Sequence, residues 1–376
     1  MNNSLVVDIL YPNKYSRWRN LEIKFFIDEF ESDILVFKIN EFAEVKFDCD
    51  YEFCNIDSNL KLQNYNILIF DPQYNHLNKY NKNIDGTLFN GKFYGSYLIT
   101  KKTDFIISNY SFVYHIFLMC YTDFNNHYTF DNKNQFIHLY PGGGFYGNIL
   151  DLKKINKDVK IISSSPITTK LLGESNDYEF IELRTGPMFN KNEKIKHKSI
   201  NNGVLTICFS SLGNGNEKGE DKYIKIVNEY KLKFPNDNVN FISIGNCCKH
   251  KHIVNYEPID YINLGNFYYD NVDIYLNLET GKSFNGWPLG MESLKSGSIL
   301  LTTDNLNNSD FYDLKSEPFY VTNDLNSYVN IIKSLYDDRI KLQKKSKEGQ
   351  KFVTTYSSYE NQQLKVKKFI NEKVLG

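Results

Sequence analysis

One block near the end of the chain, residues 273–304, constrains the fold most strongly. It runs DIYLNLETGKSFNGWPLGMESLKSGSILLTTD. Residues 274–278 have the apolar character of a strand, and a loop rich in glycine and small polar residues follows over 280–290. A helix is expected over 291–296 with Gly297 as its C-cap, and residues 298–302 return as a second strand. This alternation of strand and helix predicts an α/β sheet with parallel strands.

The same block carries groups that suit a nucleotide diphosphate. A helix N-terminus presents unpaired N–H groups and a partial positive charge, so the amides around Gly290 and Met291 are expected to bind phosphate. Glu292 is expected in the first helical turn, where its carboxylate can accept hydrogen bonds from the hydroxyl groups of a ribose.

The second half of the block, residues 288–304, resembles the C-terminal signature of the retaining GT-B glycosyltransferases, especially the large family 4 group. In that signature a glutamate is followed after seven residues by a second glutamate, small residues, a glycine and an apolar strand. Glu292 matches the second glutamate, which implies that it binds the donor ribose and that transfer retains the anomeric configuration. Phe284 occupies the place of the first glutamate, so Ser283, Phe284 and Asn285 are expected beside the donor sugar.

A second loop, residues 209–221, follows a predicted strand and reads FSSLGNGNEKGED. Its Lys218-Gly219 pair resembles the Lys-Gly pair of the same family, in which the lysine binds the donor diphosphate. Glycines on either side of Asn214, at Gly213 and Gly215, would let the backbone approach an anion while Lys218 supplies the charge. The alternative is a glycine hairpin with a solvated lysine.

Gly245 and Asn246 end another predicted strand, and they resemble the family's strand-end glycine near the nucleotide base. Residues 247–252, CCKHKH, follow at once. Clustered cysteine and histidine are zinc ligands, but vicinal cysteines rarely supply two ligands of one tetrahedral site and no second pair exists. A solvated loop is the expectation here, with no metal and no other cofactor.

The first half should bind the acceptor. The loop over residues 11–19 contains two of the four arginines of the chain, Arg17 and Arg19, and guanidinium groups favour bidentate contacts with a diphosphate. The alternative is a pair of surface arginines flanking a helix. A triple glycine after a predicted strand, Gly142, Gly143 and Gly144, permits close approach of a ligand or forms a tight turn.

Composition excludes several classes of function. The chain has 376 residues and a formal net charge of −1, which argues against a nucleic acid as the main partner. No run of 18 apolar residues and no secretory signal are present, and the six cysteines show no framework spacing, so a cytoplasmic protein without a transmembrane segment is expected. Contact with the inner face of a membrane through surface residues stays open.

The chain is long enough for two domains. Residues 184–199 are polar and without periodicity, which indicates a linker between an N-terminal acceptor-side domain, 1–190, and a nucleotide-sugar-binding domain, 200–355. The fold class expected is α/β, with two doubly wound Rossmann-like domains facing across a cleft and a C-terminal helix, 356–376, that crosses back to the first domain. Strands are expected over 5–10, 33–39, 65–70, 104–108, 135–140, 159–163, 204–209, 239–245 and 260–264, and helices over 21–30, 112–121, 168–172, 222–234 and most of 325–373. His115 is expected to be a satisfied core residue.

These observations predict a glycosyltransferase of the hexosyltransferase type. Its donor would be a UDP- or GDP-linked sugar and its acceptor a glycan, a lipid-linked molecule or a protein, with Lys218 and Glu292 as the principal residues. Two alternatives stay open: a sugar-nucleotide epimerase, and a non-catalytic binding or scaffold protein that shares the fold.

Overall fold

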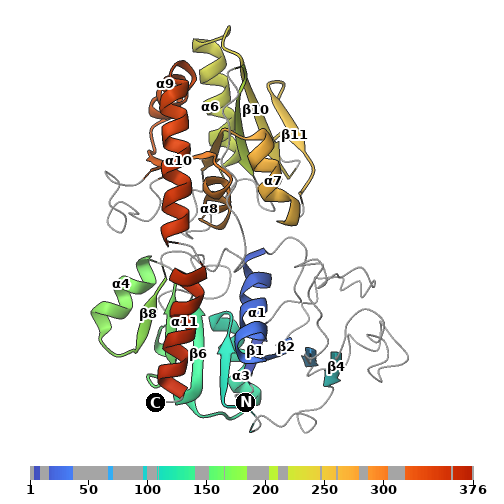
Figure 1. Ribbon diagram of the computed structural model, residues 1–376, viewed down its shortest axis with the longest axis vertical. Coiled ribbons are helices and arrows are strands. Elements are labelled where there is room, and N and C mark those ends of the chain that lie inside the picture. The colour runs from blue at the N-terminus through green and yellow to red at the C-terminus, as the bar shows by residue number, and fades with distance from the viewer. Residues whose placement is uncertain are drawn as a thin grey trace. The chain divides into compact units, whose positions relative to one another are not determined.

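The computed structural model divides the chain into two compact units. In Figure 1 one is coloured from blue to green and includes most of the dark red helix at the end of the chain, and the other is coloured from yellow to orange-red. Unit 1 comprises Met1–Pro187 and Gln362–Gly376, and unit 2 comprises Met188–Asn361. The expected linker, 184–199, lies outside the residues that the structure describes. The structure describes residues 4–8, 17–36, 67–70, 96–99, 108, 110–139, 152–164, 166–183, 203–210, 219–245, 248–259, 261–278, 287–303, 318–356 and 359–374.

Within the described residues, unit 1 contains an eight-stranded sheet in which all neighbouring strands are parallel. The strand order is β4-β3-β2-β1-β5-β6-β7-β8. The strands are β1 (Ser4–Asp8), β2 (Asp33–Val36), β3 (Ile67–Phe70), β4 (Ser96–Ile99), β5 (Phe112–His115), β6 (Gln135–Leu139), β7 (Lys160–Ser163) and β8 (Phe180–Glu182). The order reverses between β1 and β5, as in a doubly wound sheet.

Helices cover both faces of this sheet. Consecutive residues of β5 point to opposite faces, and they contact different helices. The ring of Tyr114 lies 4.0 Å from that of Phe26 on α1 (Arg17–Phe30), and the ring of His115 lies 5.2 Å from that of Phe124 on α3 (Leu118–His127). Therefore α1 and α3 pack on opposite faces.

His115 is a core residue, as predicted, but it is only half satisfied, because its buried Nδ1 has no hydrogen-bond partner among the described residues. It is fully buried, and its Nε2 lies 2.9 Å from the Oε1 of Gln135. Burial lowers the pKa of His115 to about 3, so the imidazole is neutral at physiological pH.

The prediction around β5 was wrong. Residues 112–121 were expected to form a helix after a strand over 104–108, whereas the structure places a strand at 112–115 and begins α3 at Leu118. Residue 108 lies in a 3-10 turn, and residues 104–107 are outside the described part. The sequence is apolar throughout this stretch, and periodicity cannot separate a fully buried strand from a buried helix.

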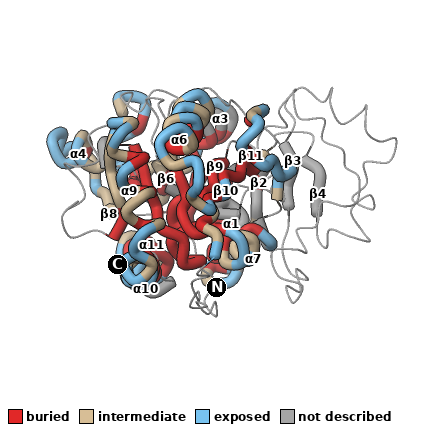
Figure 2. The backbone as a smooth tube through the Cα atoms, turned by 90° about the horizontal axis from the view of Figure 1, so that it is seen from above, coloured by how far each residue is buried: buried red, intermediate tan, exposed pale blue. Residues whose placement is uncertain are grey.

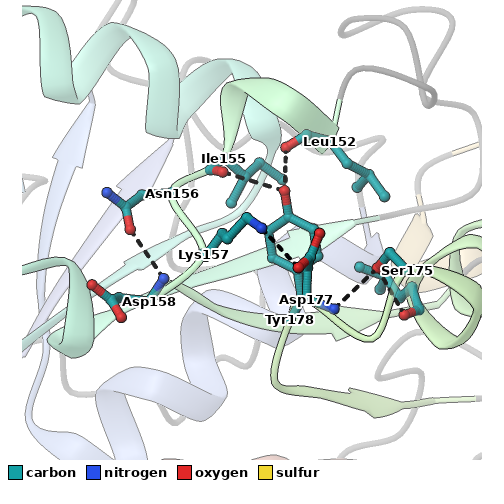
Figure 3. Close-up of polar contacts among 9 residues, drawn as sticks. Leu152, Ile155, Asn156, Lys157, Asp158, Ser175, Asp177 and Tyr178 are labelled. Atoms are coloured by element: carbon teal, nitrogen blue, oxygen red, sulfur yellow. Dashed lines mark hydrogen bonds and ion pairs between the residues drawn. The ribbon is translucent and has the colours of Figure 1, made fainter.

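A set of polar contacts fixes the connection from β6 to β8 in unit 1 (Figure 3). The hydroxyl of Tyr178 donates to the carbonyl oxygen of Leu152 at 2.7 Å, and Lys157 forms an ion pair with Asp177 at 2.7 Å. These contacts join the 3-10 turn at Leu152–Lys154 to the segment between α4 (Pro166–Ser175) and β8. They hold the edge of the sheet that carries β7 and β8.

The last helix, α11 (Tyr359–Val374), packs within unit 1. The ring of Phe369 lies 6.0 Å from that of Phe136 on β6, at 84° to it. Lysines of α11 form ion pairs with Glu29 on α1 and with Glu179 beside β8. These contacts tie the end of the chain to three elements that are distant in sequence.

Within the described residues, unit 2 contains a six-stranded parallel sheet in the order β11-β10-β9-β12-β13-β14. The strands are β9 (Leu205–Ser210), β10 (Val239–Ile244), β11 (Ile253–Tyr256), β12 (Ile274–Asn277), β13 (Ile299–Thr302) and β14 (Tyr320–Val321). In chain order this is 3-2-1-4-5-6, the arrangement of a doubly wound nucleotide-binding sheet. Both sheets therefore confirm the predicted α/β class.

Two apolar layers sandwich the sheet of unit 2. One contains α6 (Glu220–Lys233) and α9 (Leu325–Asp337), through buried residues such as Tyr223 and Tyr328. The other contains α7 (Tyr261–Asn271), α8 (Trp287–Lys295) and α10 (Arg339–Tyr356), through residues such as Tyr268 and Leu294. The buried central strands are red in Figure 2.

Two elements of unit 2 differ from the prediction. Residues 260–264 were expected to be a strand, but α7 begins at Tyr261; the strand in this region is β11, which was not predicted. Three of the four residues of β11 are exposed, because it forms the edge of the sheet, so it lacks the apolar pattern of a buried strand. No helix in the described part of the chain is both long and apolar enough to span a membrane.

The packing of α11 on unit 1 can be tested by substitution. Phe369→Ala removes a ring that is 6% exposed, so it should lower the free energy of unfolding by about 3–4 kcal/mol. Leu364→Ala on the same helix is the matched control; this side chain is 41% exposed, and its loss should cost about 0.5 kcal/mol or less. Denaturant unfolding measures both changes, and equal effects would contradict the packing described.

Candidate functional site

The reversal of strand order in unit 2 lies between β9 and β12, which pair in parallel from Ile274 opposite Ile207 to Leu276 opposite Phe209. From β9 the chain passes through α6 to β10 on one side, and from β12 it passes through α8 to β13 on the other. In open α/β sheets, ligands bind beyond the carboxyl ends of the two strands at such a point. The segments that leave these ends, 211–218 and 279–286, were the two loops predicted to bind the donor.

A contact between backbones joins the start of α6 to the residue that follows β12. Gly219, the N-cap of α6, has a left-handed conformation with φ of 89° and ψ of 30°. A Cβ atom at this position would lie 2.2 Å from the carbonyl oxygen of Leu278, the residue that follows β12. Only glycine fits, because both the φ angle and the space exclude a side chain.

The two helix N-termini at this edge differ in charge. The first turn of α6 carries Glu220 and Asp221, whose carboxylates offset the positive end of the helix dipole. The first turn of α8 carries no acidic residue. The N-terminus of α8 is thus the better binding site for an added anion.

Helix α8 begins at Trp287, four residues earlier than predicted. Pro288 fits its first turn, where the missing N–H costs no hydrogen bond. Glu292 is consequently in the second turn, not the first. The unpaired amides of an α-helix are those of its first turn, so the N–H groups of Trp287 and Leu289 are open, whereas those of residues 290 and 291 bond within the helix.

Gly290 and Met291 serve the packing of α8. A Cβ at Gly290 would lie 3.1 Å from a methyl carbon of Leu300 on β13, so glycine allows the helix to approach the strand closely. The side chain of Met291 is fully buried in the layer formed with α7 and α10.

The carboxylate of Glu292 lies between α7 and α8. The residue is 3% exposed, and its Oε1 is 3.7 Å from the Nζ of Lys295, which is 7% exposed. A Cβ at Gly265 of α7 would lie 2.7 Å from this Oε1. Gly265 therefore provides the space that the carboxylate occupies. Sequence reasoning missed both Gly265 and Lys295, although the i, i+3 spacing of Glu292 and Lys295 is a recognisable helical pair.

Gly245 ends β10 with φ of 105°, and its N–H donates to the carbonyl oxygen of Tyr256 at 2.9 Å. The loop that follows is only partly solvated, in contrast to the prediction. Cys248 is fully buried and is held by hydrogen bonds with the side chain of Asn255, while residues 249–252 are largely exposed. Among the residues that the structure describes, no three His, Cys, Asp or Glu side chains are grouped as metal ligands.

Several predicted site residues lie outside the described residues. They are Gly142, Gly143, Gly144, Gly213, Asn214, Gly215, Lys218, Asn246, Ser283, Phe284 and Asn285. Arg17 and Arg19 were expected in a loop, but α1 begins at Arg17, so both belong to the first turn of a helix.

Unit 1 contains a buried polar network that the sequence did not reveal. The Nδ1 of His138 on β6 lies 2.6 Å from the Oε1 of Glu22 on α1, and its Nε2 lies 2.6 Å from the Oγ of Ser164. The hydroxyl of Tyr114 donates to Glu22, and burial raises the pKa of that hydroxyl, as does the charge of Glu22. All four residues are at most 2% exposed, and the network fixes α1 against β5, β6 and the residue that follows β7. The sequence signal that could have revealed the network is a polar residue, His138, within a strand that is buried on both faces.

Comparison with known proteins rests on structure alone, since no protein-family model and no curated protein sequence match the chain. The chain is similar to HepE of Anabaena in complex with UDP and glucose, with a TM-score of 0.61, 9% identity and complete coverage of both chains. It is similar to the sucrose-phosphate synthase of Thermosynechococcus elongatus, with a TM-score of 0.61, 9% identity and 99% coverage of each. The fold is GT-B.

A third similar structure is the pneumococcal O-GlcNAc transferase GtfA in complex with UDP and GlcNAc, with a TM-score of 0.51 and 14% identity. The match covers 70% of this chain and 57% of that transferase. At these identities the likeness defines the fold, and the chemistry has to be argued from the residues of this chain.

The contact between Gly219 and Leu278 predicts a specific sensitivity. Gly219→Ala should lower the free energy of unfolding by about 2–4 kcal/mol, because it combines an unfavourable φ with a clash against a carbonyl group. Gly173→Ala on α4 is the control: no atom lies within 4 Å of its Cβ position, so helix propensity should stabilise the protein by roughly 0.5–1 kcal/mol. Denaturant unfolding of both variants provides the measurement, and a neutral Gly219→Ala would show that the two backbones do not meet.

Proposed function

We propose that this chain is a glycosyltransferase that moves a sugar from a UDP- or GDP-linked donor to a glycan, a lipid-linked molecule or a protein. The observation that carries the proposal is the close approach of Gly219 to Leu278 at the reversal of strand order. This contact fixes the start of α6 beside the residue that follows β12, and Lys218 precedes Gly219 in the sequence. The next helix after β12 is α8, whose first turn carries no acidic residue. The GT-B fold shared with structures that hold UDP and a sugar supports the same conclusion.

Each group has a role in this proposal. Lys218 and the open amides of Trp287 and Leu289 bind the diphosphate, and Glu292 accepts hydrogen bonds from the ribose. Ser283, Phe284 and Asn285 line the donor sugar, and Gly245 with Asn246 borders the base. The assignments of Lys218, Glu292, Gly245, Asn246 and residues 283–285 follow the resemblance to the family 4 signature, and those of Trp287 and Leu289 follow the start of α8.

Chemistry of this kind depends mainly on the leaving group. Cleavage of the bond between sugar and phosphate places negative charge on the diphosphate, and fixed positive groups stabilise that charge in the transition state. An ammonium at residue 218 and the N-terminus of α8 supply such groups. The acceptor side is assigned to unit 1, and transfer is proposed to retain the anomeric configuration. Comparing the anomeric signals of donor and product by NMR tests the stereochemistry.

Removal of the lysine charge is the direct test of the donor site. Lys218→Ala should weaken binding of the nucleotide sugar by about 1.5–3 kcal/mol, the range for a hydrogen bond to a charged group, with the fold intact. Lys225→Ala, an exposed lysine later on α6, is the matched control and should leave affinity unchanged. Calorimetric titration with UDP- and GDP-sugars measures both. Equal affinities of the two variants would mean that the donor site is misplaced.

If the wild-type protein binds a nucleotide sugar but transfers no sugar to any mixture of acceptors, the non-catalytic alternative is favoured.

The placement of Glu292 can be tested without altering it. Gly265→Ala should displace the carboxylate and weaken nucleotide affinity roughly tenfold, with stability changed by less than about 1 kcal/mol because only the end of a side chain must move. Gly349→Ala on α10 is the control. Its Cβ would lie 2.8 Å from a methyl carbon of Leu294 on α8, the helix that carries Glu292. It presses on α8 without touching the carboxylate. If the two variants bind the nucleotide equally well, Glu292 does not contact it.

A further inference from the structure

Helix α10 carries a strong local excess of positive charge. Its sequence, RIKLQKKSKEGQKFVTTY, contains six basic residues and one acidic residue, in a chain whose formal net charge is −1. This excess is independent of the donor site, because none of these residues has a role there.

The charges are not spread evenly around the helix. Leu342, Ser346, Gly349, Gln350 and Val353 are buried and form the side that packs on unit 2, where Ser346 donates to the carbonyl oxygen of Gly297 at 2.6 Å. The spacing of Ile340, Lys344, Lys347 and Lys351 is four, three and four residues, which places them in one line along the helix. All four are exposed, and they lie opposite the buried side.

We call Lys344, Lys347 and Lys351 the lysine stripe. Among the residues that the structure describes, none of the three has an ion-pair partner. Lys345, which lies on the flank of the helix, differs: its Nζ is 2.9 Å from the Oε2 of Glu348. The lysine on the flank is thus paired with a carboxylate. The lysine stripe, which is about 10 Å long, has no such partner in the described part of the chain.

We propose that the lysine stripe adsorbs the protein onto a membrane surface that is rich in anionic phospholipid. Lysine ammonium groups are compact and strongly hydrated, so they suit a diffuse layer of headgroups. Ile340, 81% exposed at one end of the line, adds an apolar contact with the interface. The apolar side of α10 is already packed on unit 2, so the helix lies on the surface and does not insert.

A nucleic acid is the less suitable partner. Lysine can contact the phosphates of a nucleic acid, but the reading of bases relies largely on arginine and on aromatic side chains, and the stripe offers neither. The single arginine of α10, Arg339, is turned onto the ring of Tyr336, with its guanidinium carbon 5.1 Å from the ring centre. Helix α10 is the long helix labelled in the upper part of Figure 1.

The experiment uses the full chain and sedimentation with vesicles of phosphatidylcholine, with or without 30% phosphatidylserine. The wild-type protein should sediment with the anionic vesicles and be released by 0.5 M salt. Each lysine near an anionic surface contributes roughly fivefold to partitioning, so K344Q/K347Q/K351Q should bind about 100-fold more weakly. Unfolding temperatures should be unchanged, because all three side chains are exposed.

The triple substitution K225Q/K249Q/K251Q is the matched control, since it removes three exposed lysines elsewhere on unit 2. It should retain binding to the vesicles. Equal loss in the two triple variants would overturn the proposal, because net charge and not the stripe would then be responsible. Failure of the wild-type protein to sediment with anionic vesicles would overturn it as well, as would binding of an RNA oligonucleotide that depends on the stripe while vesicles are ignored.

Discussion

The close approach of the Gly219 backbone to the carbonyl oxygen of Leu278 is the constraint on which the site depends. Two parallel strands can be neighbours while the loops beyond them diverge. Here the N-cap of α6 is in contact with the first residue after β12, so the start of α6 is fixed beside the carboxyl end of β12. The left-handed φ of Gly219 turns the chain into α6 at that point. Lys218 precedes Gly219 in the sequence, and the segment after Leu278 leads to the N-terminus of α8.

Much of this arrangement could be predicted from the sequence, because strands that are buried on both faces are short apolar runs between loops. The strands β9, β10, β12 and β13 and the helices α6 and α8 of unit 2 followed from that pattern. The pattern failed where it has no discriminating power. Residues 112–115 are apolar on both sides of the strand and were assigned to a helix, and the start of α7 at Tyr261 was assigned to a strand. Residues 112–115 form a strand because they pair with β1 and β6, whereas residues 261–264 pair with no strand and belong to α7.

The side-chain environment of the site was less predictable than its location. Glu292 was placed one turn too early because Pro288 was taken as part of a loop, although proline is favoured in the first turn of a helix. Its burial depends on Gly265 and Lys295, which come from another helix and from the next turn. The network of Glu22, Tyr114, His138 and Ser164 joins four segments, and the sequence shows single polar residues in apolar runs without showing which of them meet. Contacts of this kind are set by the tertiary fold.

The central claim is that the loops after β9 and β12 bind one nucleotide diphosphate together. Hydrogen exchange of the full chain, followed by mass spectrometry with and without a UDP-sugar or a GDP-sugar, tests it most directly. The claim predicts slower exchange in two separate peptides, one covering residues 211–219 and one covering 279–290, at the same nucleotide concentration. Protection of only one of them, or protection elsewhere with both unchanged, would contradict the claim.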